Sequence, residues 1–311
     1  MYCVTLPIDG VASRPWWRRL EGAVTEAAPL ARHTTYRVGG PAEYLVVPAN
    51  AGDVALVFAS GEPVFVMGAG SNLLVADAGF DGVVLKVAHT LAYLSVAEGE
   101  VVVGAGRALP SLVQTCVDAG LAGMEWAVGI PGTVGGATAT NAGAFGGAMW
   151  DRIVYAEVVT AGGKSVRVRP ADVTAGYRRV TFPFAPPFAV VEVALAVTPA
   201  ARVAVAELAD GYRARRQAGQ PQGEASAGCV FKNPPVGPSA GELIDRAGLK
   251  GHRRGGAVVS EKHANFILNA GGAKAADIYG LLREVQRRVR EASGVELELE
   301  LTLVGDFGDG D

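Results

Sequence analysis

An α+β fold with at least two parts is the fold class that the sequence predicts, and three observations carry this prediction. Short apolar runs of strand length alternate with segments of helical spacing along the whole chain. Their order is not the regular strand–helix–strand succession of a parallel α/β protein. A polar stretch rich in Gly and Pro covers residues 219–238, so we place the division between the parts near 200–220.

The elements of the first part follow from local patterns. The run PVFVM at 63–67 is apolar throughout and has strand length, whereas 109–118 has helical spacing and stops at Gly120. Gly162 and Gly163 separate two strand-like runs, which predicts a hairpin. The expected elements are a helix beginning at 15–20, strands at 43–48, 63–67, 83–87 and 101–103, helices near 53–58 and over 109–118, a hairpin of 154–160 with 164–169, and a strand at 188–197.

The second part is expected to open with a helix over 203–217 that becomes basic at its end, which suits the negative pole of a helix C-terminus. Ser239 and Glu242 form a capping-box pattern that predicts a short helix ending at Gly248. Residues 295–303 alternate strictly between apolar and polar side chains, as in a strand with one buried face. The remaining expected elements are strands at 258–259 and 266–268, a helix over 275–291 and a loose acidic tail over 306–311.

Composition excludes several classes of protein. Half of the 311 residues are apolar and 19% are charged, which gives a sizeable core and excludes wholesale disorder. No membrane span or secretory signal is expected from the hydropathy pattern. A net charge of −3 gives no overall attraction to nucleic acid or to a membrane. Cys3, Cys116 and Cys229 are too scattered for a disulfide framework or a zinc cluster, so we expect no metal site and a reducing compartment.

Glycine is unusually abundant, with 42 residues, and it clusters in loops between apolar runs. Glycine lets backbone N–H groups approach a ligand closely, so these loops predict a large phosphorylated ligand, with plain turn chemistry as the alternative. The loop 68–72 (GAGSN) follows a predicted strand directly and can wrap a phosphate. It is not a full dinucleotide fingerprint, because Leu73 stands where a third glycine is required.

A second glycine-rich stretch covers 129–136 (GIPGTVGG) and continues through 141–146. It is longer and richer in glycine than an ordinary connector. Two such loops can embrace one diphosphate, and the alternative is a tight packing point between backbone segments.

Three further segments carry reactive groups. Cys229 can donate a proton, since a thiol titrates nearer neutrality than a hydroxyl, although a lone cysteine is more often a small buried hydrophobe. Arg178 can bind a carboxylate or phosphate through two parallel hydrogen bonds. The glutamates of 295–303 more often mark a face in water than a catalytic site.

Taken in order, these segments resemble the UDP-N-acetylenolpyruvoylglucosamine reductase family, flavoenzymes of early peptidoglycan synthesis. The resemblance rests on the ordered set, because no single motif is decisive. The matching stretches are 33–42 (HTTYRVGGPA), 68–72, 129–136 with 141–144 (NAGA), Tyr177 with Arg178, 228–234 (GCVFKNP), 242–245 (ELID) through 263–266 (HANF), and the last strand with Glu300.

The resemblance implies a two-part FAD-binding region of the PCMH type, similar to vanillyl-alcohol oxidase, followed by a C-terminal α+β substrate-binding domain. It implies a cytoplasmic enzyme with a small-molecule substrate and no obligate protein partner. The implied boundaries are an N-terminal extension at 1–30, the FAD-binding region at 31–200 in subdomains of about 31–90 and 91–200, the substrate-binding domain at 201–305 and a tail at 306–311.

The implied reaction uses NADPH to reduce non-covalently bound FAD. The enolpyruvyl ether of UDP-N-acetylglucosamine then enters the same cleft and receives hydride at its terminal carbon. Negative charge develops as an enolate on the substrate carboxylate, and the neighbouring carbon takes a proton.

The resemblance also implies the site residues. Arg178 stabilises the enolate with Glu300 as its acidic partner, and Cys229 supplies the proton. The implied cofactor-binding residues are Gly68, Ala69, Gly70, Ser71, Asn72, Pro131, Gly132, Thr133, Gly135, Gly136, Asn141 and Gly143. The implied substrate-binding residues are Tyr177, Lys232, Asn233 and His263.

Two features depart from the family pattern. Cys229 occupies a position that is commonly Ser, which affects the expected rate and pH profile rather than the reaction. The short distance from Arg178 to the next strand resembles the form of the family without the extra substrate-covering loop. The residues that hold the substrate diphosphate therefore stay open, with Arg215 and Arg216 as candidates against a role at the surface end of a helix.

The same residues also fit other kinds of protein. One is a sugar or lactone oxidase of the same broad fold, which often tethers its flavin covalently. Another is a non-catalytic flavin or nucleotide-binding module that kept the loops and lost the acid. A plain nicotinamide dehydrogenase fits less well, because the loop at 68–72 lacks the remaining fingerprint.

Overall fold

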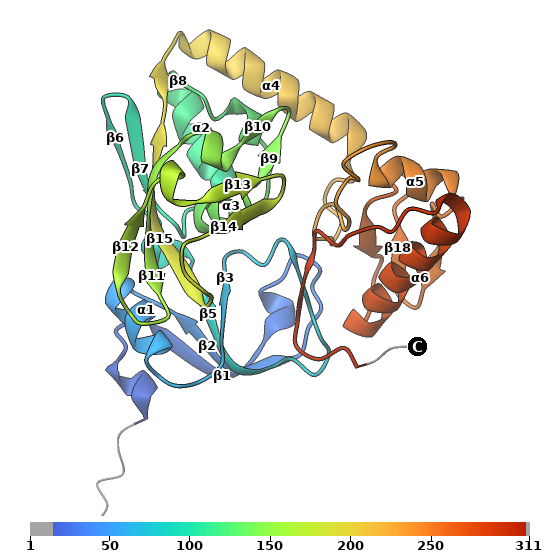
Figure 1. The fold of residues 1–311 in the computed structure, drawn as a ribbon, viewed down its shortest axis with the longest axis horizontal. Coiled ribbons are helices and arrows are strands. Elements are labelled where there is room, and N and C mark those ends of the chain that lie inside the picture. Colours follow the sequence, from blue (N-terminus) through green and yellow to red (C-terminus); the bar gives the residue numbers. More distant parts are fainter. Residues whose placement is uncertain (1–14, 309–311) are drawn as a thin grey trace, which may run out of the picture.

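Residues 15–308 are described by a computed structural model of the chain. Residues 15 to about 200 form two sheet-containing bodies, and the long helix α4 (Arg202–Gly219) leads from them to a C-terminal body (Figure 1). The α+β prediction is confirmed, because mostly antiparallel sheets, with parallel pairs in the first body, combine with helices that do not alternate regularly with the strands. Cys3, half of the predicted N-terminal extension and the end of the predicted tail lie outside the described residues.

The first body is a mixed four-stranded sheet with the order β1-β2-β5-β3. Its strands β2 and β3 run parallel to β5, which buries Val83, Val84 and Leu85 between apolar layers on both faces. Because β3 pairs only with β5, its other edge is free to face the second body. The elements are β1 (Ala23–Pro29), β2 (Pro41–Val47), α1 (Ala51–Phe58), β3 (Val64–Met67), β4 (Leu73–Val75) and β5 (Phe80–Lys86).

The second body is a five-stranded antiparallel sheet with the order β12-β11-β15-β7-β6, and it shares one large apolar core with helices α2 and α3. The predicted hairpin at Gly162 and Gly163 is confirmed as β11 and β12. The main elements are β6 (Leu94–Ala97), β7 (Glu100–Gly104), α2 (Leu109–Asp118), α3 (Val134–Thr140), β11 (Ile153–Thr160), β12 (Ser165–Val168) and β15 (Phe188–Ala196). The short strands are β8 (Leu121–Ala122), β9 (Gly143–Ala144), β10 (Gly147–Ala148), β13 (Thr174–Gly176), β14 (Arg179–Thr181) and β16 (Thr198–Pro199).

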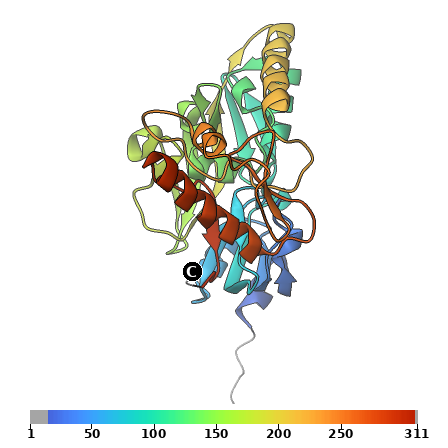
Figure 2. The ribbon, with the colours of Figure 1, turned by 90° about the vertical axis from the view of Figure 1, so that its right-hand side faces the viewer.

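The C-terminal body has its own apolar core, built on the face of α6 that Ile278, Leu281 and Val285 define. Figure 2 shows α6 crossing in front of the other bodies. No helix among residues 15–308 has the length and apolar character needed to cross a membrane. The remaining elements are α5 (Ala240–Arg246), β17 (Arg253–Arg254), β18 (Ala257–Val259), β19 (Ile267–Asn269), α6 (Ala275–Ser293) and β20 (Thr302–Val304).

The predicted strand at 295–303 is wrong in its extent. Only β20 forms a ladder, and it pairs in parallel with β4 of the first body. The residues before it are extended and pair with the loop after Cys229, where Lys232 N donates to Glu298 O at 2.8 Å and Glu300 N donates to Val230 O at 2.9 Å. The alternation still separates the buried Leu297 and Leu301 from the exposed Glu296 and Glu298, because an extended chain has a period of two with or without a regular ladder, whereas Glu300 is partly buried.

Several elements were not predicted from the sequence, and for β1 and α3 the physical reason is clear. Strand β1 lies where no clear pattern was recognised, and its residues are mostly exposed, so they need no apolar alternation. Helix α3 lies inside the second glycine-rich stretch, where glycine lowers helix propensity. Thr133 caps it by accepting from Gly136 N at 3.3 Å.

Asp77 joins the first body to the C-terminal body. Its carboxylate accepts from the N–H groups of Ala275 at 2.9 Å and Ala276 at 3.0 Å, at the first turn of α6. We expect Asp77→Ala to lower the free energy of unfolding by about 1–2 kcal/mol, because two helix N–H groups lose their acceptor. Urea unfolding measures this, with Asp81→Ala, another exposed aspartate of the same body, as the matched control. Equal stabilities of the two variants would show that the contact contributes nothing.

Candidate active site

The two glycine-rich loops meet face to face. A Cβ built on Gly68 would lie 2.3 Å from Thr133 Oγ1, and one on Gly132 would lie 2.9 Å from Ser71 Oγ. Side chains larger than hydrogen at these glycines would push the loops apart. The tertiary structure thus brings together the loops 68–72 and 129–136, as the sequence predicts.

A cavity of about 280 Å³ opens beside this contact. One wall is the free edge of β3, and the opposite wall is made by α3 and the first residues of β15. Within residues 15–308, the backbone N–H groups of Ala69, Gly70 and Ser71 donate to no protein acceptor. The lining residues are 64–68, Val87, Thr133, Gly135, Gly136, Ala139, 186–188 and Val190. An apolar slot beside free backbone donors suits a nucleotide with a diphosphate.

Three residues predicted to bind the cofactor use their atoms within the protein. Asn72 Nδ2 donates to the backbone oxygen of Glu300 at 3.0 Å, which ties the first loop to the extended segment. Asn141 is buried, with its amide bonded at both ends to backbone groups. Gly143 pairs with Ala148, where a Cβ on Gly143 would lie 2.6 Å from Gly147 O. These contacts are of the kind expected for a tight packing point between backbone segments. Pro131, in contrast, is exposed.

Arg178 and Glu300 form an ion pair between the second body and the extended segment. Arg178 Nε lies 2.6 Å from Glu300 Oε1, and the two side chains are 24% and 17% exposed. Arg178 Nε is buried and, despite this distance, has no aligned hydrogen-bond acceptor among the described residues. Burial raises the pKa of Glu300, and the nearby Arg178 and Lys232 oppose that increase.

Arg178 occupies the turn between β13 and β14 with a φ of 54°. A left-handed conformation is strained for a residue with a long side chain, and such strain tends to occur at functional sites. The turn holds the guanidinium over the edge of the second body, toward the C-terminal body.

Cys229 lies partly buried against Val258, Phe266 and Leu268. Burial raises the pKa of its thiol to about 12; Glu300 adds to the increase, and Arg178 and Arg216 oppose it. The sulfur therefore keeps its proton at neutral pH and can donate it. The three predicted catalytic groups lie close together, since Glu300 and Arg178 both act on the pKa of Cys229 and Arg178 acts on the pKa of Glu300, although the three come from distant parts of the chain.

The raised pKa of Cys229 predicts slow alkylation, because only the thiolate reacts. We expect the rate with iodoacetamide to rise steadily with pH through pH 10, without a plateau near the ordinary thiol pKa of about 8.5. Peptide mapping by mass spectrometry separates Cys229 from the other cysteines, and free glutathione is the reference. A plateau below pH 9 would contradict the raised pKa.

Arg216 turns toward this cluster, whereas Arg215 does not. A Cβ on Gly129 would lie 2.9 Å from Arg216 Cδ, which places Arg216 against the second glycine-rich loop. Burial and the nearby Arg178 lower the pKa of Arg216, and it pairs with no carboxylate among the described residues. Arg215 instead lies 5.3 Å over the ring of Phe145. A half-buried cation without a carboxylate partner is suited to an anionic ligand.

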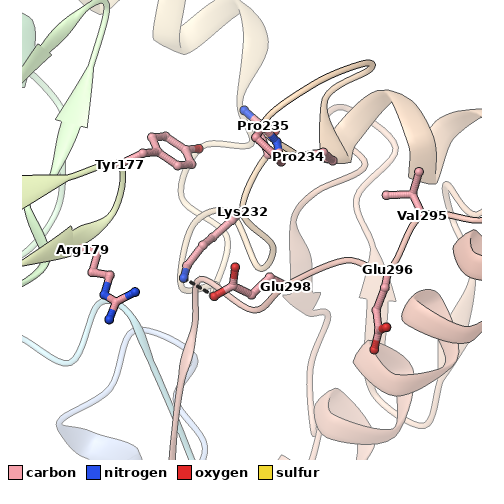
Figure 3. Close-up of a pocket in the computed structure, with 9 residues that line it drawn as sticks. Tyr177, Arg179, Lys232, Pro234, Pro235, Val295, Glu296 and Glu298 are labelled. Atoms are coloured by element: carbon pink, nitrogen blue, oxygen red, sulfur yellow. Dashed lines mark hydrogen bonds and ion pairs between the residues drawn. The ribbon is translucent and has the colours of Figure 1, made fainter.

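A wider cavity of about 920 Å³ separates the β13–β14 turn from the C-terminal body (Figure 3). Tyr177 and Arg179 reach it from the turn, and Lys232 enters from the loop after Cys229, with Nζ 2.5 Å from Glu298 Oε1. The other lining residues are Asn233, Pro234, Pro235, Val295 and Glu296.

Two predicted substrate-binding residues have structural contacts. Asn233 Oδ1 accepts from Ala240 N at 3.0 Å, at the start of α5, which leaves its Nδ2 for a ligand. His263 packs on Phe266 with ring centroids 5.0 Å apart, and it is not part of the wall of the wider cavity. Burial lowers the pKa of His263, so its ring is neutral at pH 7.

The sequence interpretation missed several residues of the two cavities. Arg179 adjoins a predicted position, so the hairpin would have revealed it had β13 and β14 been recognised. Glu298 stands out only through its pairing with Lys232, which is 66 residues away. The residues 186–190 carry no signal, because they form an apolar strand start like any other.

Two models of known protein families match different parts of the chain. Residues 220–304 match the model of the UDP-N-acetylenolpyruvoylglucosamine reductase C-terminal domain, and residues 42–169 match that of an FAD binding domain.

Curated relatives match over nearly the whole chain. The UDP-N-acetylenolpyruvoylglucosamine reductase 2 of Symbiobacterium thermophilum is 43% identical, over 91% of this chain and 93% of that protein. The UDP-N-acetylenolpyruvoylglucosamine reductase of Alkalilimnicola ehrlichii is 43% identical, over 93% and 97%. The crystal structure of the Thermus caldophilus UDP-N-acetylenolpyruvylglucosamine reductase superposes with a TM-score of 0.80 at 38% identity, covering 92% of this chain and all of that one.

Proposed function

The chain belongs to the UDP-N-acetylenolpyruvoylglucosamine reductase family, and from that premise we propose how its residues carry out the reaction. It is an FAD-dependent oxidoreductase that uses NADPH to reduce UDP-N-acetylglucosamine enolpyruvate to UDP-N-acetylmuramate in peptidoglycan synthesis. The first body and the second body correspond to the FAD-binding region, and the C-terminal body to the substrate-binding domain.

The facing glycine loops fit FAD. The free N–H groups of residues 69–71 suit the diphosphate, and the slot of about 280 Å³ beside β3 suits an apolar heterocycle. Gly68, Gly132 and Thr133 keep the loops close, while Asn72 joins the first loop to Glu300. Bound here, FAD would supply hydride transfer from NADPH to the terminal enolpyruvyl carbon.

Arg178 and Glu300 stabilise the charge that develops on the substrate. The Arg178 guanidinium, whose Nε has no aligned acceptor among the described residues, suits an oxygen of the substrate carboxylate, where the enolate forms. Glu300 holds the guanidinium in place, with Nε 2.6 Å from its carboxylate. Arg216 adds a second cation on the same side, and we assign it, rather than Arg215, to an anionic group of the substrate.

Cys229 donates the proton to the carbon next to the carboxylate. Its S–H proton transfers to the enolate carbon, and solvent later restores the thiol. Because the pKa of the thiol is about 12, it is fully protonated at neutral pH, as a general acid must be.

The wider cavity receives the UDP-sugar portion. Lys232 and Arg179 supply positive charge for the diphosphate, and Tyr177, 57% exposed, offers a ring against which a sugar or base can stack. Asn233 contributes its free Nδ2, whereas His263, which lies outside the wall of this cavity, is given no role in binding. We further propose a cytoplasmic location, a small-molecule substrate, and no obligate protein or nucleic-acid partner.

The observation that carries this proposal is the placement of Arg178, Cys229 and Glu300 beside the facing glycine loops. A visible spectrum tests it. The purified protein should be yellow, lose that absorbance on anaerobic addition of NADPH, and recover it when UDP-N-acetylglucosamine enolpyruvate is added. Acid denaturation should release the chromophore.

Failure to recover on addition of the substrate, with rapid recovery in oxygen, would favour an oxidase. A chromophore that stays attached after denaturation would also contradict non-covalent binding. A protein without a chromophore that also binds no added FAD would overturn the proposal.

A further inference from the structure

We propose that Asn141 is a positioning residue that holds the β13–β14 turn so that Arg178 reaches Glu300. The inference rests on the proposed function, because Arg178 matters only if it acts on the substrate. It differs from the expectation that Asn141 binds the cofactor directly.

Both ends of the Asn141 amide are bonded to backbone. Nδ2 donates to Gly176 O at 2.9 Å, and Oδ1 accepts from Trp150 N at 3.1 Å. The residue is 7% exposed and ends helix α3 with a φ of 49°. Asparagine tolerates this left-handed conformation, which aims its side chain across at the neighbouring turn.

The turn needs such support. Strands β13 and β14 form a two-stranded sheet whose residues are mostly exposed, and such a pair is marginal by itself in water. Arg178 has positive φ in this turn, which costs about 1–3 kcal/mol and persists only when surrounding contacts impose it. Gly176 O, the atom that Asn141 holds, lies two residues before Arg178.

Trp150 contacts the residue that follows β14, the second strand of the turn. Its backbone N–H binds Asn141, and its ring packs edge-on against Phe182, directly after β14, with centroids 5.9 Å apart. Its indole Nε1 donates to Thr138 O in α3 at 2.9 Å. Asn141 and Trp150 therefore fix both strands of the turn to one short helix.

The position of the guanidinium depends on this arrangement. Arg178 Nε lies 2.6 Å from Glu300 Oε1, and the backbone of Glu300 is held by hydrogen bonds to Val230 O and from Asn72 Nδ2. A displacement of the turn would therefore lengthen the ion pair. A shift of the turn by about 1 Å is enough to reduce a rate about 100-fold.

Two variants separate the interactions. Asn141→Asp keeps the left-handed conformation and the acceptor for Trp150 N, but it replaces the donor to Gly176 O with a carboxylate oxygen that repels it. Asn141→Gly keeps the conformation and removes both bonds. Thr140→Ala is the matched control, because the Thr140 hydroxyl bonds only within α3, to Gly136 O.

We expect both Asn141 variants to bind FAD with wild-type affinity, measured by flavin fluorescence titration, and to be reduced by NADPH at the wild-type rate. Reoxidation by the enolpyruvyl substrate, followed by stopped flow, should slow by about 10- to 100-fold. Deuterium uptake should rise in the segment 174–181 in both variants, and in Asn141→Gly it should also rise at Trp150, whose N–H loses its acceptor. In an Arg178→Ala background, Asn141→Asp should slow reoxidation no further.

Weaker FAD affinity with wild-type reoxidation at saturating FAD would overturn the proposal and assign Asn141 to the cofactor. Uptake that rises equally along the chain, or additive effects with Arg178→Ala, would also overturn it. Wild-type protein that does not turn over the substrate refutes the proposed function instead, and the deuterium uptake still tests whether Asn141 holds the turn.

Discussion

Replacing Cys229 by alanine is expected to leave reduction by NADPH intact and to slow reoxidation by the enolpyruvyl substrate by about 100-fold or more, the usual loss when a general acid is removed. The reason is the thiol proton. Burial raises the pKa of Cys229 to about 12, so the group is protonated at every pH at which the enzyme is assayed. Anaerobic stopped-flow absorbance of the flavin measures the two half-reactions separately.

Two controls sharpen this experiment. Cys229→Ser keeps a proton donor of similar size and should restore most of the rate, whereas Cys116→Ala, at a buried thiol in the core of the second body, should not affect reoxidation at constant flavin content. If Cys229→Ala reoxidises at the wild-type rate, the thiol is only a packing group.

Glu300→Gln should reduce the rate of substrate reoxidation by about 100-fold or more, because the guanidinium that stabilises the developing charge loses its anionic partner. The matched control is Glu298→Gln, two residues earlier in the same extended segment. Glu298 is 74% exposed and pairs with Lys232, so its loss should change substrate affinity more than the rate at saturation.

The comparison requires flavin content and unfolding midpoints of both variants, so that a folding defect is not mistaken for a chemical one. Equal effects of the two substitutions on the saturated rate would refute the assignment of Glu300. A larger effect of Glu298→Gln would move the acidic role to the wider cavity.

Much of the fold was predictable because it depends on local patterns. The hairpin at Gly162, the helix that begins at Ser239 and the apolar face of α6 were all readable from turn residues, a capping box and helical spacing. Strand pairing over long distances was not. The extended residues before β20 alternate like a strand, but they pair with the loop after Cys229, while β20 itself pairs with β4, and no local pattern specifies either partner.

Some residues of the candidate site were predictable from the sequence, and others were distinguished only by the structure. The glycine loops, Arg178 and Cys229 could be found from residue type and order, while Arg216 and Arg215 were equivalent in sequence and differ only in which side of α4 faces Gly129. Asn141 was predicted to bind the cofactor because it lies in a glycine-rich stretch, whereas the structure shows what the sequence could not, that its amide bonds to backbone groups 9 and 35 residues away.

The sequence by itself determined the fold class, the family and the kinds of group present, since spacing, composition and residue identity are properties of the chain in order. Only the tertiary structure decided which groups meet: Arg178 with Glu300, Lys232 with Glu298, and one glycine loop with the other. The physical reason is that ion pairs and close backbone approaches depend on distances of a few ångströms between residues far apart in sequence. Those distances are set by how the three bodies pack, because local backbone preferences do not extend that far.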